Sequence, residues 1–375
     1  MDIPLLISFI IGCFMLIQLE LKFCAPHIKW IFIVLFGLII ALRNIKVPDT
    51  ELYLEYFDLD HYDLFDFSHS SFEVGFQFFT KLLKIIVLGN FEAYLGFIVI
   101  INLLIIEFSV NRIGKLYRCE ILERDVKLSF VGKNRFFINP MFSILPLTLY
   151  VSFFGIYLNA IVLRVGITLS LVVLASTFAI KTKKSLVDFI LIIAALILAY
   201  LFHSTAIFGF LIIIILLSNF KFSKKIYLWI WFIIGIIYFT NFSTWLGNTV
   251  FSFMISLNEV TLLASKLSSY DGNVIHEIEG VSMKFLFSWI MCFFLIYYST
   301  NSKIFYKYLN VYLIGLTIFG LFRSILLIER VTDYFLLFSF ICFYLFLIMQ
   351  KPVKFWLYFI PIVFMQLIFV LRITN

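Results

Sequence analysis

The residues of this chain best suited to chemistry are arginines, carboxylates and a histidine that interrupt long apolar runs. Arg43 closes one such run in LRNIKVPDTELYLEYF, and Asp49 follows it closely. Arg164, His203 and Arg323 stand inside or between later apolar runs. Guanidinium groups hold multi-oxygen anions through fixed forks of donors, and a carboxylate or a neutral imidazole can take a proton from a hydroxyl. These residue types indicate a phosphate- or pyrophosphate-binding site beside a proton acceptor.

The elements that must position these residues are apolar helices. Of the 375 residues, 63% are hydrophobic and only 14% are charged. A soluble domain carries about 25% charged residues, so this chain cannot cover a water-facing surface. Most of its apolar blocks hold 17 to 24 residues, which matches the roughly 20 residues that a helix needs to cross a bilayer. The sequence predicts an all-α polytopic integral membrane protein forming one membrane domain, residues 1–375.

Charge distribution predicts how these helices are oriented. The segment 112–135 holds seven basic residues against three acids, whereas 43–73 holds eight acids against two bases. Because Lys and Arg accumulate on the cytoplasmic side, the basic segment is expected inside and the acidic one outside. Long outer loops are predicted at 43–90 and 243–281. The predicted apolar blocks are 2–19, 28–42, 73–89, 91–111, 137–154, 157–180, 186–202, 204–219, 226–242, 283–299, 308–328, 332–349 and 354–371.

The block 73–89 breaks this alternation if it spans the membrane. Its apolar part is barely long enough to span, and Lys81 and Lys84 lie in its middle. We therefore interpret it as a short interfacial or re-entrant helix. About twelve spans remain, both chain ends lie outside, and the basic clusters fall on the cytoplasmic side.

With this topology, five cationic residues are predicted at one depth near the outer face. Arg43 ends the second helix, Arg164 lies about two turns below the outer end of the 157–180 helix, and His203 lies in an outer turn. Arg323 is predicted inside a span, and Arg330 would share its face two turns later if the helix continues. A charge inside a span costs about 2.5–3.5 kcal/mol on insertion scales, so such residues mark function by default.

Several classes of site are not supported by the sequence. The five cysteines show neither CxxC nor Cys/His spacing, which argues against a disulfide framework or a metal site. No Gly-rich phosphate loop, HExxH or GxSxG motif is present. The net charge of +7 falls in loops that flank predicted helices, so it reports topology and does not predict nucleic-acid binding. Neither a cofactor nor a metal is expected.

An ordered set of short motifs resembles the EpsG/Wzy-type polysaccharide polymerases. The motifs are LRNIKVPDTELYLEYF, FEVGFQFF, LNAIVLRVGITLSL, LFHSTAIFGF and RVTDYF, and together they cover most of the chain. Two positions depart from the family pattern: Pro48 stands where a glycine usually precedes the aspartate, and Val165 stands where glutamine is frequent. The motif positions in this chain are Arg43, Asp49, Tyr53, Glu73, Gly75, Phe76, Arg164, His203, Ser204, Arg330 and Tyr334.

The resemblance implies a metal-independent membrane glycosyltransferase of GT-C-like architecture, acting as an O-antigen or capsule polymerase. Such an enzyme transfers a glycan from undecaprenyl diphosphate to another lipid-linked repeat unit. The implied location is the bacterial cytoplasmic (inner) membrane, with the active site on the periplasmic side. The implied partners are the two undecaprenyl-diphosphate-linked oligosaccharides and the lipid bilayer, and a polysaccharide chain-length regulator is left open.

The resemblance also implies roles for individual residues. Arg164, Arg323 and Arg330 would hold the donor diphosphate, and Arg43 would anchor the acidic loop or the second pyrophosphate. The base is left open among three residues, which are Asp49, Glu73 and His203. Tyr53, Ser204 and Tyr334 are expected to contact substrate.

Plainer interpretations stand beside these roles. Arg43 can pair with Asp49, Glu73 can offset a helix dipole, and His203 can be only a hydrogen-bonding turn residue. Asp333 can be the counter-ion of Arg330. Three other activities remain as alternatives. They are an O-antigen ligase, which differs in its acceptor, a flippase for lipid-linked oligosaccharides, and a membrane acyltransferase.

Overall fold

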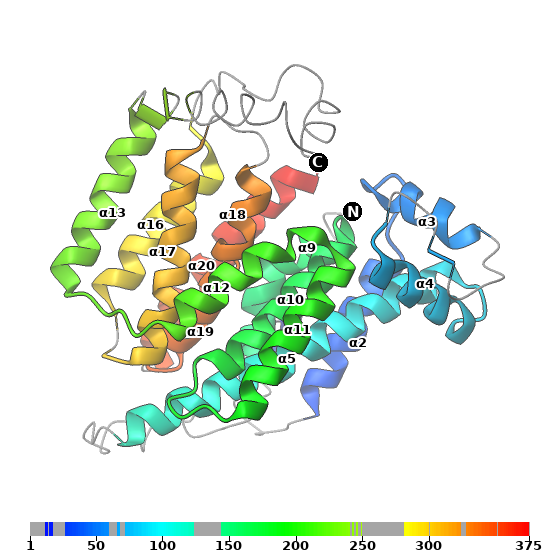
Figure 1. The fold of residues 1–375 in the computed structure, drawn as a ribbon, viewed down its shortest axis with the longest axis horizontal. Coiled ribbons are helices and arrows are strands. Elements are labelled where there is room, and N and C mark those ends of the chain that lie inside the picture. The colour runs from blue at the N-terminus through cyan, green and yellow to red at the C-terminus, as the bar shows by residue number, and fades with distance from the viewer. Residues whose placement is uncertain are drawn as a thin grey trace. The chain divides into compact units, whose positions relative to one another are not determined.

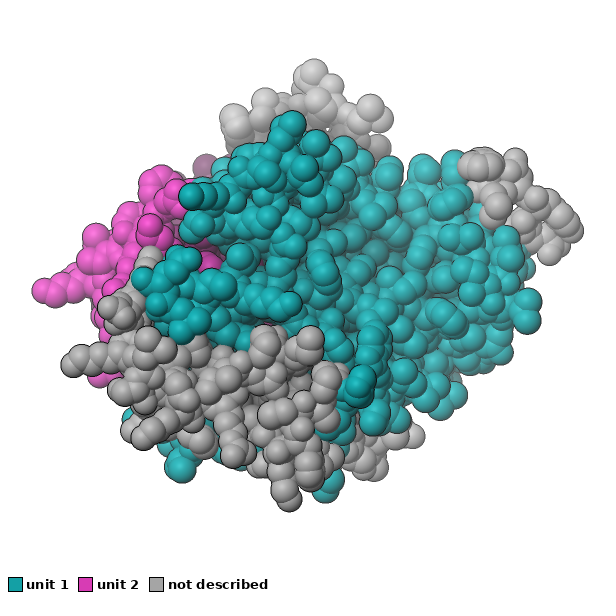
Figure 2. All heavy atoms as spheres, turned by 90° about the horizontal axis from the view of Figure 1, so that it is seen from below, with its two compact units in different colours: residues 1–217, 343–375 teal, residues 218–342 magenta. Residues whose placement is uncertain are grey.

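The computed structural model is all-helical in the part of the chain that it describes. These residues are 12–13, 15–17, 27–59, 66–67, 72–123, 144–240, 242–243, 245–246, 249, 281–299, 301–323, 328–350 and 352–374. The chain divides into two compact units (Figure 2). Unit 1 comprises residues 1–217 and 343–375, and unit 2 comprises 218–342. A single membrane domain over 1–375 stays a prediction.

Four apolar helices lie side by side in unit 1 (Figure 1). They are α2 (Ile28–Ala41), α5 (Phe91–Glu123), α10 (Leu163–Ala179) and α11 (Leu186–Phe202). The helices α12 (Ile207–Leu217) and α20 (Pro352–Thr374) belong to the same unit. The 33-residue α5 continues through 112–123, beyond the predicted end of its apolar block at residue 111. That prediction was wrong because charged residues can continue a helix beyond its apolar part.

Two short helices lie at one end of unit 1 (Figure 1). They are α3 (Thr50–Asp58) and α4 (Val74–Ile86). Aromatic rings join them: Tyr53 lies 5.9 Å from Phe72 and 5.7 Å from Phe76, between ring centroids. At about 1.5 Å per residue the 13 residues of α4 extend only about 20 Å, which is too short to span a bilayer. The predicted short helix is therefore present, and its location at the membrane interface stays a prediction.

A break interrupts the apolar stretch before α10. The chain runs through α8 (Ile144–Tyr150), the π-helical η1 (Val151–Gly155) and α9 (Ile156–Ala160), and it leaves helical geometry at Val162. The predicted continuous helix 157–180 is therefore wrong. Arg164 lies in the first turn of α10 and not two turns inside a helix.

Buried amide groups stabilise this break. The Asn159 side chain donates to the carbonyl of Gly155 at 2.6 Å, and it accepts from Asn102 Nδ2 of α5 at 3.0 Å. The Asn159 carbonyl accepts from Arg43 Nη1 at 3.0 Å. Side chains from other elements thus satisfy polar groups that an uninterrupted α-helix would satisfy internally.

Unit 2 is a smaller set of helices with aromatic contacts. It contains α13 (Lys224–Phe239), α16 (Met283–Tyr297), α17 (Lys303–Leu321) and α18 (Ile328–Leu336), while α19 (Ser339–Leu347) crosses the division between the units. Trp231 and Trp289 stack at 4.3 Å, and each indole N–H donates to the other residue's carbonyl oxygen. This paired contact fixes α13 against α16.

Three helices of the described residues are long and apolar enough to cross a membrane. They are Phe91–Glu123, Lys303–Leu321 and Arg330–Leu347, and shorter apolar helices of 10–17 residues accompany them. The described residues confirm an all-helical protein with membrane-span candidates, whereas the count of about twelve spans and the GT-C-like architecture stay predictions. The predicted helix 2–19 and the predicted loop 243–281 lie largely outside the described residues.

Candidate active site around Glu73

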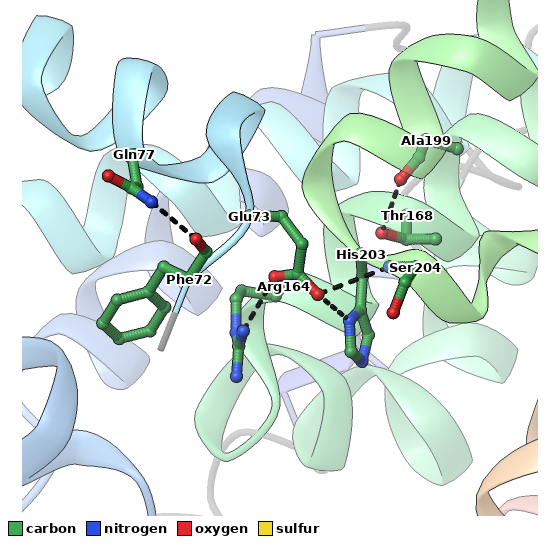
Figure 3. A network of polar contacts seen from close by, with 8 residues as sticks. All are labelled: Phe72, Glu73, Gln77, Arg164, Thr168, Ala199, His203 and Ser204. Carbon is green, nitrogen blue, oxygen red and sulfur yellow. Dashed lines mark hydrogen bonds and ion pairs between the residues drawn. The ribbon is translucent and has the colours of Figure 1, made fainter. Parts of the chain in front are cut away.

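Glu73 brings together two of the predicted site residues (Figure 3). Its Oε2 accepts a hydrogen bond from Arg164 Nη1 at 2.8 Å, and its Oε1 lies 2.6 Å from His203 Nδ1. The backbone N–H of Ser204 donates to the same Oε1 at 3.3 Å. One carboxylate therefore joins the starts of α4 and α10 and the turn after α11. The sequence separates these residues by up to 131 positions.

The fold brings these segments together through a close backbone approach. Glu73 is the N-cap of α4, and Gly75 follows in the first turn of that helix. A Cβ at Gly75 would lie 2.7 Å from the carbonyl oxygen of Leu201 on α11, so a larger residue would push the two helices apart. His203 is the C-cap of α11, two residues after Leu201, and its backbone is extended. The close packing of α4 against α11 therefore explains why a glycine stands at this position of the E-x-G-F motif.

The electrostatics of the site favour an ionised Glu73. Burial alone would raise its pKa, but the hydrogen bond with His203 and the positive charges of His203 and Arg164 outweigh burial and lower the pKa to about 2. An ionised carboxylate only accepts hydrogen bonds, so His203 Nδ1 is the donor in this contact. Among the described residues no contact engages Nε2. When the ring is neutral, Nε2 is the nitrogen that can accept a proton.

The three side chains of this site remain partly open to solvent. The exposed fractions are 23% for Glu73, 21% for Arg164 and 22% for His203. Glu73 makes no side-chain cap to the N–H groups of α4, so its carboxylate faces the two cations instead. The closest partners of the Glu73 carboxylate are therefore Arg164 and His203, and not the N–H groups at the start of α4.

Arg164 is held on its other side by aromatic residues of the α3–α4 region. Its guanidinium carbon lies 4.8 Å from the ring centroid of Phe72, in cation–π geometry. Tyr53 accepts a hydrogen bond from Arg164, and burial raises the pKa of Tyr53. These contacts limit the rotamers of Arg164, so its guanidinium is pre-positioned beside Glu73.

Arg43 lies between α3 and α9 and is almost fully buried. Its Nε donates to Thr50 Oγ1 at 3.0 Å and its Nη1 donates to the Asn159 carbonyl at 3.0 Å. Its Nη2 is buried and makes no hydrogen bond to the described residues. Burial lowers the pKa of Arg43 to about 10, against the opposing effect of tyrosines and Asp49.

The alternative in which Arg43 pairs with Asp49 is not seen among the described residues, where the bonded nitrogens of Arg43 engage neutral oxygens. Asp49 follows Pro48 with a φ of 62°, a left-handed conformation that aspartate tolerates better than most residues. This conformation begins α3 at Thr50, the residue that Arg43 contacts. Asp49 therefore lies beside the Arg43 region without touching the Glu73 group among the described contacts.

The remaining predicted residues lie in unit 2. Arg323 donates from Nη1 to the Tyr238 carbonyl at 2.9 Å, and its guanidinium carbon lies 4.9 Å from the ring centroid of Tyr238. Arg330 is exposed on α18, and Tyr334 is buried on the same helix. Convergence of these residues with the Glu73 group stays a prediction.

Two expectations about unit 2 were wrong. Because α17 ends at Leu321, Arg323 lies in the turn after that helix and not inside it. Residues 324–327 lie outside the described residues, so a face shared by Arg323 and Arg330 stays a prediction. Asp333 forms an ion pair with Lys284 at 2.5 Å, so its described partner is Lys284 and not Arg330. The sequence did not predict Lys284 as the partner of Asp333, because Lys284 lies 49 residues earlier in an apolar segment.

Within the described residues no group of three or more His, Cys, Asp and Glu side chains has the arrangement of a metal site.

The long apolar helices define the class: an integral membrane protein whose partly open site pairs a carboxylate with a histidine and an arginine. The chain belongs to the EpsG family, whose family model matches residues 28–375. EpsG is associated with Wzy-type polymerases, so the resemblance seen in the motifs is confirmed. Comparisons with curated proteins and with solved structures gave no match.

Proposed function

We propose that this protein is a polysaccharide polymerase that joins lipid-linked oligosaccharides at the periplasmic face of the bacterial cytoplasmic membrane. The donor is a glycan on undecaprenyl diphosphate and the acceptor is a second lipid-linked repeat unit. The observation that carries the proposal is the Glu73–His203–Arg164 group in a chain of the EpsG family. It supports the proposal because a histidine that can accept a proton and an arginine that can bind an anion both contact one carboxylate.

His203 is the base in this proposal, and Glu73 is its positioning residue. The Glu73 carboxylate fixes Nδ1 as the protonated nitrogen, which leaves Nε2 to take the proton from the acceptor hydroxyl. The acceptor oxygen then forms a bond to the anomeric carbon of the donor sugar. The bond between that carbon and the diphosphate oxygen breaks, and the electron pair leaves with the diphosphate.

Arginines stabilise the departing diphosphate. Arg164 is pre-positioned by Phe72 and Tyr53, and Arg43 offers a buried Nη2 without a protein partner. Fixed donors aimed at developing negative charge are worth most where water is partly excluded. Many transferases assign this task to a divalent cation, and we propose that guanidinium groups perform it here. Arg323, Arg330 and Tyr334 of unit 2 are proposed to hold the donor, while Ser204 and Asp49 contact sugar hydroxyls.

The test is polymerisation by the purified full-length protein in proteoliposomes with a lipid-linked repeat unit. Removing a general base lowers rates by about 10²–10⁴, so His203→Ala should abolish the glycan ladder. His27→Ala is the matched control, because His27 is the exposed N-cap residue of α2 and no described contact joins it to Glu73, Arg164 or His203. Full ladders from His203→Ala in a protein that inserts normally would overturn the assignment of the base.

A cellular experiment separates this activity from the alternatives. Deletion of a polymerase leaves a single repeat unit on the lipid core, whereas deletion of a ligase leaves none. A flippase would move lipid-linked oligosaccharide across proteoliposomes without lengthening it. Polymer formation by the purified protein is the result that excludes both.

A further inference from the structure

A stripe of cations covers the end of α5 that is remote from Glu73. Arg112, Lys115 and Arg118 follow one another at three-residue spacing, so each neighbouring pair is adjacent on the helix surface. Like charges at such spacing repel one another. We refer to these three residues as the α5 stripe. The proposed sugar-transfer reaction uses none of them.

Arg118 is the most unusual member of the stripe. It is only 7% exposed, and within the described part of the chain neither Nε nor Nη1 has a hydrogen-bond partner. Its side chain folds back along α5, because Nη2 lies 3.2 Å from the position that a Cβ on Gly114 would occupy. The Tyr344 hydroxyl oxygen lies 2.5 Å from the same position, so a larger residue at 114 would displace both groups. A buried guanidinium without acceptors is costly unless an anion meets it.

Arg112 shows the same lack of acceptors. Its Nε is buried and has no hydrogen-bond partner in the residues that the structure describes, and its guanidinium carbon lies 4.3 Å from the ring centroid of Phe178. Glu107 is the acid closest before it on α5, and that carboxylate is engaged by Lys29 and Asn111. Among the described residues no member of the stripe forms an ion pair.

The exposed side chains around Lys115 indicate what kind of anion could bind the α5 stripe. Phe108 and Leu122 are 53% and 49% exposed, and both stand seven residues from Lys115 along the helix. Seven residues are about two turns, so the exposed cation shares a face with exposed apolar side chains. A cation on an apolar helix face suits the boundary between acyl chains and phosphate headgroups.

The length of α5 places the stripe at the opposite membrane surface from Glu73. Tyr94, which is hydrogen-bonded to Thr80 of α4, marks the Glu73 end of the helix. Arg118 lies 24 residues further along α5, about 36 Å at 1.5 Å per residue. The hydrocarbon core of a bilayer is about 30 Å thick, so both ends reach headgroup regions.

We propose that Arg112, Lys115 and Arg118 bind the phosphate of an anionic phospholipid headgroup in the leaflet opposite the Glu73 site. The two arginines supply N–H donors that lack protein acceptors, and Lys115 adds charge at the lipid-facing surface. Phosphate oxygens match guanidinium forks in geometry and charge. The site is independent of the proposed polymerisation, since its ligand is a structural lipid and its readout is binding.

The experiment measures phospholipid binding to the full-length protein by native mass spectrometry and thermal unfolding in detergent. Phosphatidylglycerol is the probe, and phosphatidylcholine and inorganic pyrophosphate are the comparison arms. Removing one cation near an anionic headgroup should weaken binding about five-fold, and the double variant Arg112→Gln/Arg118→Gln should weaken it roughly 25-fold. Lys115→Gln keeps the buried residues intact and should lose about five-fold. Lys225→Gln, an exposed lysine of α13, is the matched control and should retain full binding.

Each alternative result is decisive. Equal retention of phosphatidylglycerol by wild type, Lys115→Gln and the double variant would overturn the site. Equal stabilisation by phosphatidylcholine would overturn the requirement for an anionic headgroup. Stabilisation by pyrophosphate alone would show that the stripe takes a free phosphate, which overturns the lipid as its source.

Discussion

Glu73 in unit 1 and Asp333 in unit 2 are both carboxylates paired with a cation, yet their surroundings differ. Glu73 contacts Arg164 and His203, and all three side chains are more than a fifth exposed. Asp333 contacts Lys284 at 2.5 Å, with side chains only 7% and 11% exposed. The partly exposed Glu73 group, called the open group below, can admit a substrate. The buried Asp333–Lys284 pair, called the closed pair below, neutralises two charges between α16 and α18. Similar ion-pair distances therefore accompany different proposed roles.

The largest expected effect is on catalysis at the open group. Glu73→Gln keeps the shape of the side chain but removes the charge that fixes His203 Nδ1, so polymerisation should fall by about 10²–10⁴. The quantity to measure is the rate of glycan extension by protein in proteoliposomes. Glu107→Gln is the matched control, because it breaks a different ion pair of unit 1, the one between Glu107 and Lys29. Equal losses in both variants would remove the distinction between Glu73 and an ordinary ion pair.

The second effect is on the stability of the closed pair. Asp333→Asn leaves Lys284 buried without its counter-ion, which should destabilise the protein by about 3–5 kcal/mol. Denaturant unfolding in detergent measures this loss. The double variant Lys284→Met/Asp333→Leu should recover most of it, since replacing both charges removes the desolvation cost. A wild-type unfolding midpoint for Asp333→Asn would contradict the structural role.

The third effect is the pH dependence of stability at the open group. The pKa of Glu73 is lowered from 4.5 to about 2 in the folded protein, so its ionised form stabilises folding above pH 4.5. This contribution should disappear as the pH falls from about 4.5 to 2. Thermal unfolding of wild type and Glu73→Gln across this range should show the difference between them shrinking. A constant difference would mean that the pKa of Glu73 is the same in the folded and the unfolded protein, which would contradict this account.

The smallest expected effect is that of a chelator. Because arginines are proposed to neutralise the diphosphate, EDTA should leave the polymerisation rate of wild type unchanged. Loss of activity with EDTA and its rescue by one divalent ion would refute the role given to Arg164 and Arg43. The Arg164→Ala variant provides the comparison, since it should be inactive with or without added cation.

Topology has its own test at Cys119, an exposed thiol near the end of α5. In a variant that keeps Cys119 alone, a membrane-impermeant reagent should label the protein in inverted vesicles and not in intact cells. Labelling in intact cells would reverse the predicted orientation. It would also place the α5 stripe on the same side as the proposed substrate.

Much of the Glu73 group could be predicted because its residues are polar exceptions in an apolar chain. Glu73, Arg164 and His203 were each found by residue type and motif order, although their mutual contacts depend on Gly75 packing on α11. The break at Val162 could not be predicted, since no proline or glycine marks it. Buried Asn159 stabilises that break, and membrane hydropathy does not register one amide.

The closed pair in unit 2 was missed for a related reason. Lys284 stands in an apolar segment, and its partner follows 49 residues later, so only tertiary packing joins them. The end of α17 at Leu321 was missed as well, because the apolar run resumes at residues 325–328 after only Arg323 and Ser324. Apolar periodicity predicts that helices exist, while side-chain contacts between helices decide where they stop.

A structure of the full-length protein with a lipid diphosphate bound tests the central claim most directly. We predict that the phosphate oxygens contact Arg164 and that His203 Nε2 faces the acceptor side of the anomeric carbon. Glu73 should remain bonded to Nδ1 in that complex. A diphosphate held away from Arg164, with His203 turned from the sugar, would contradict the account.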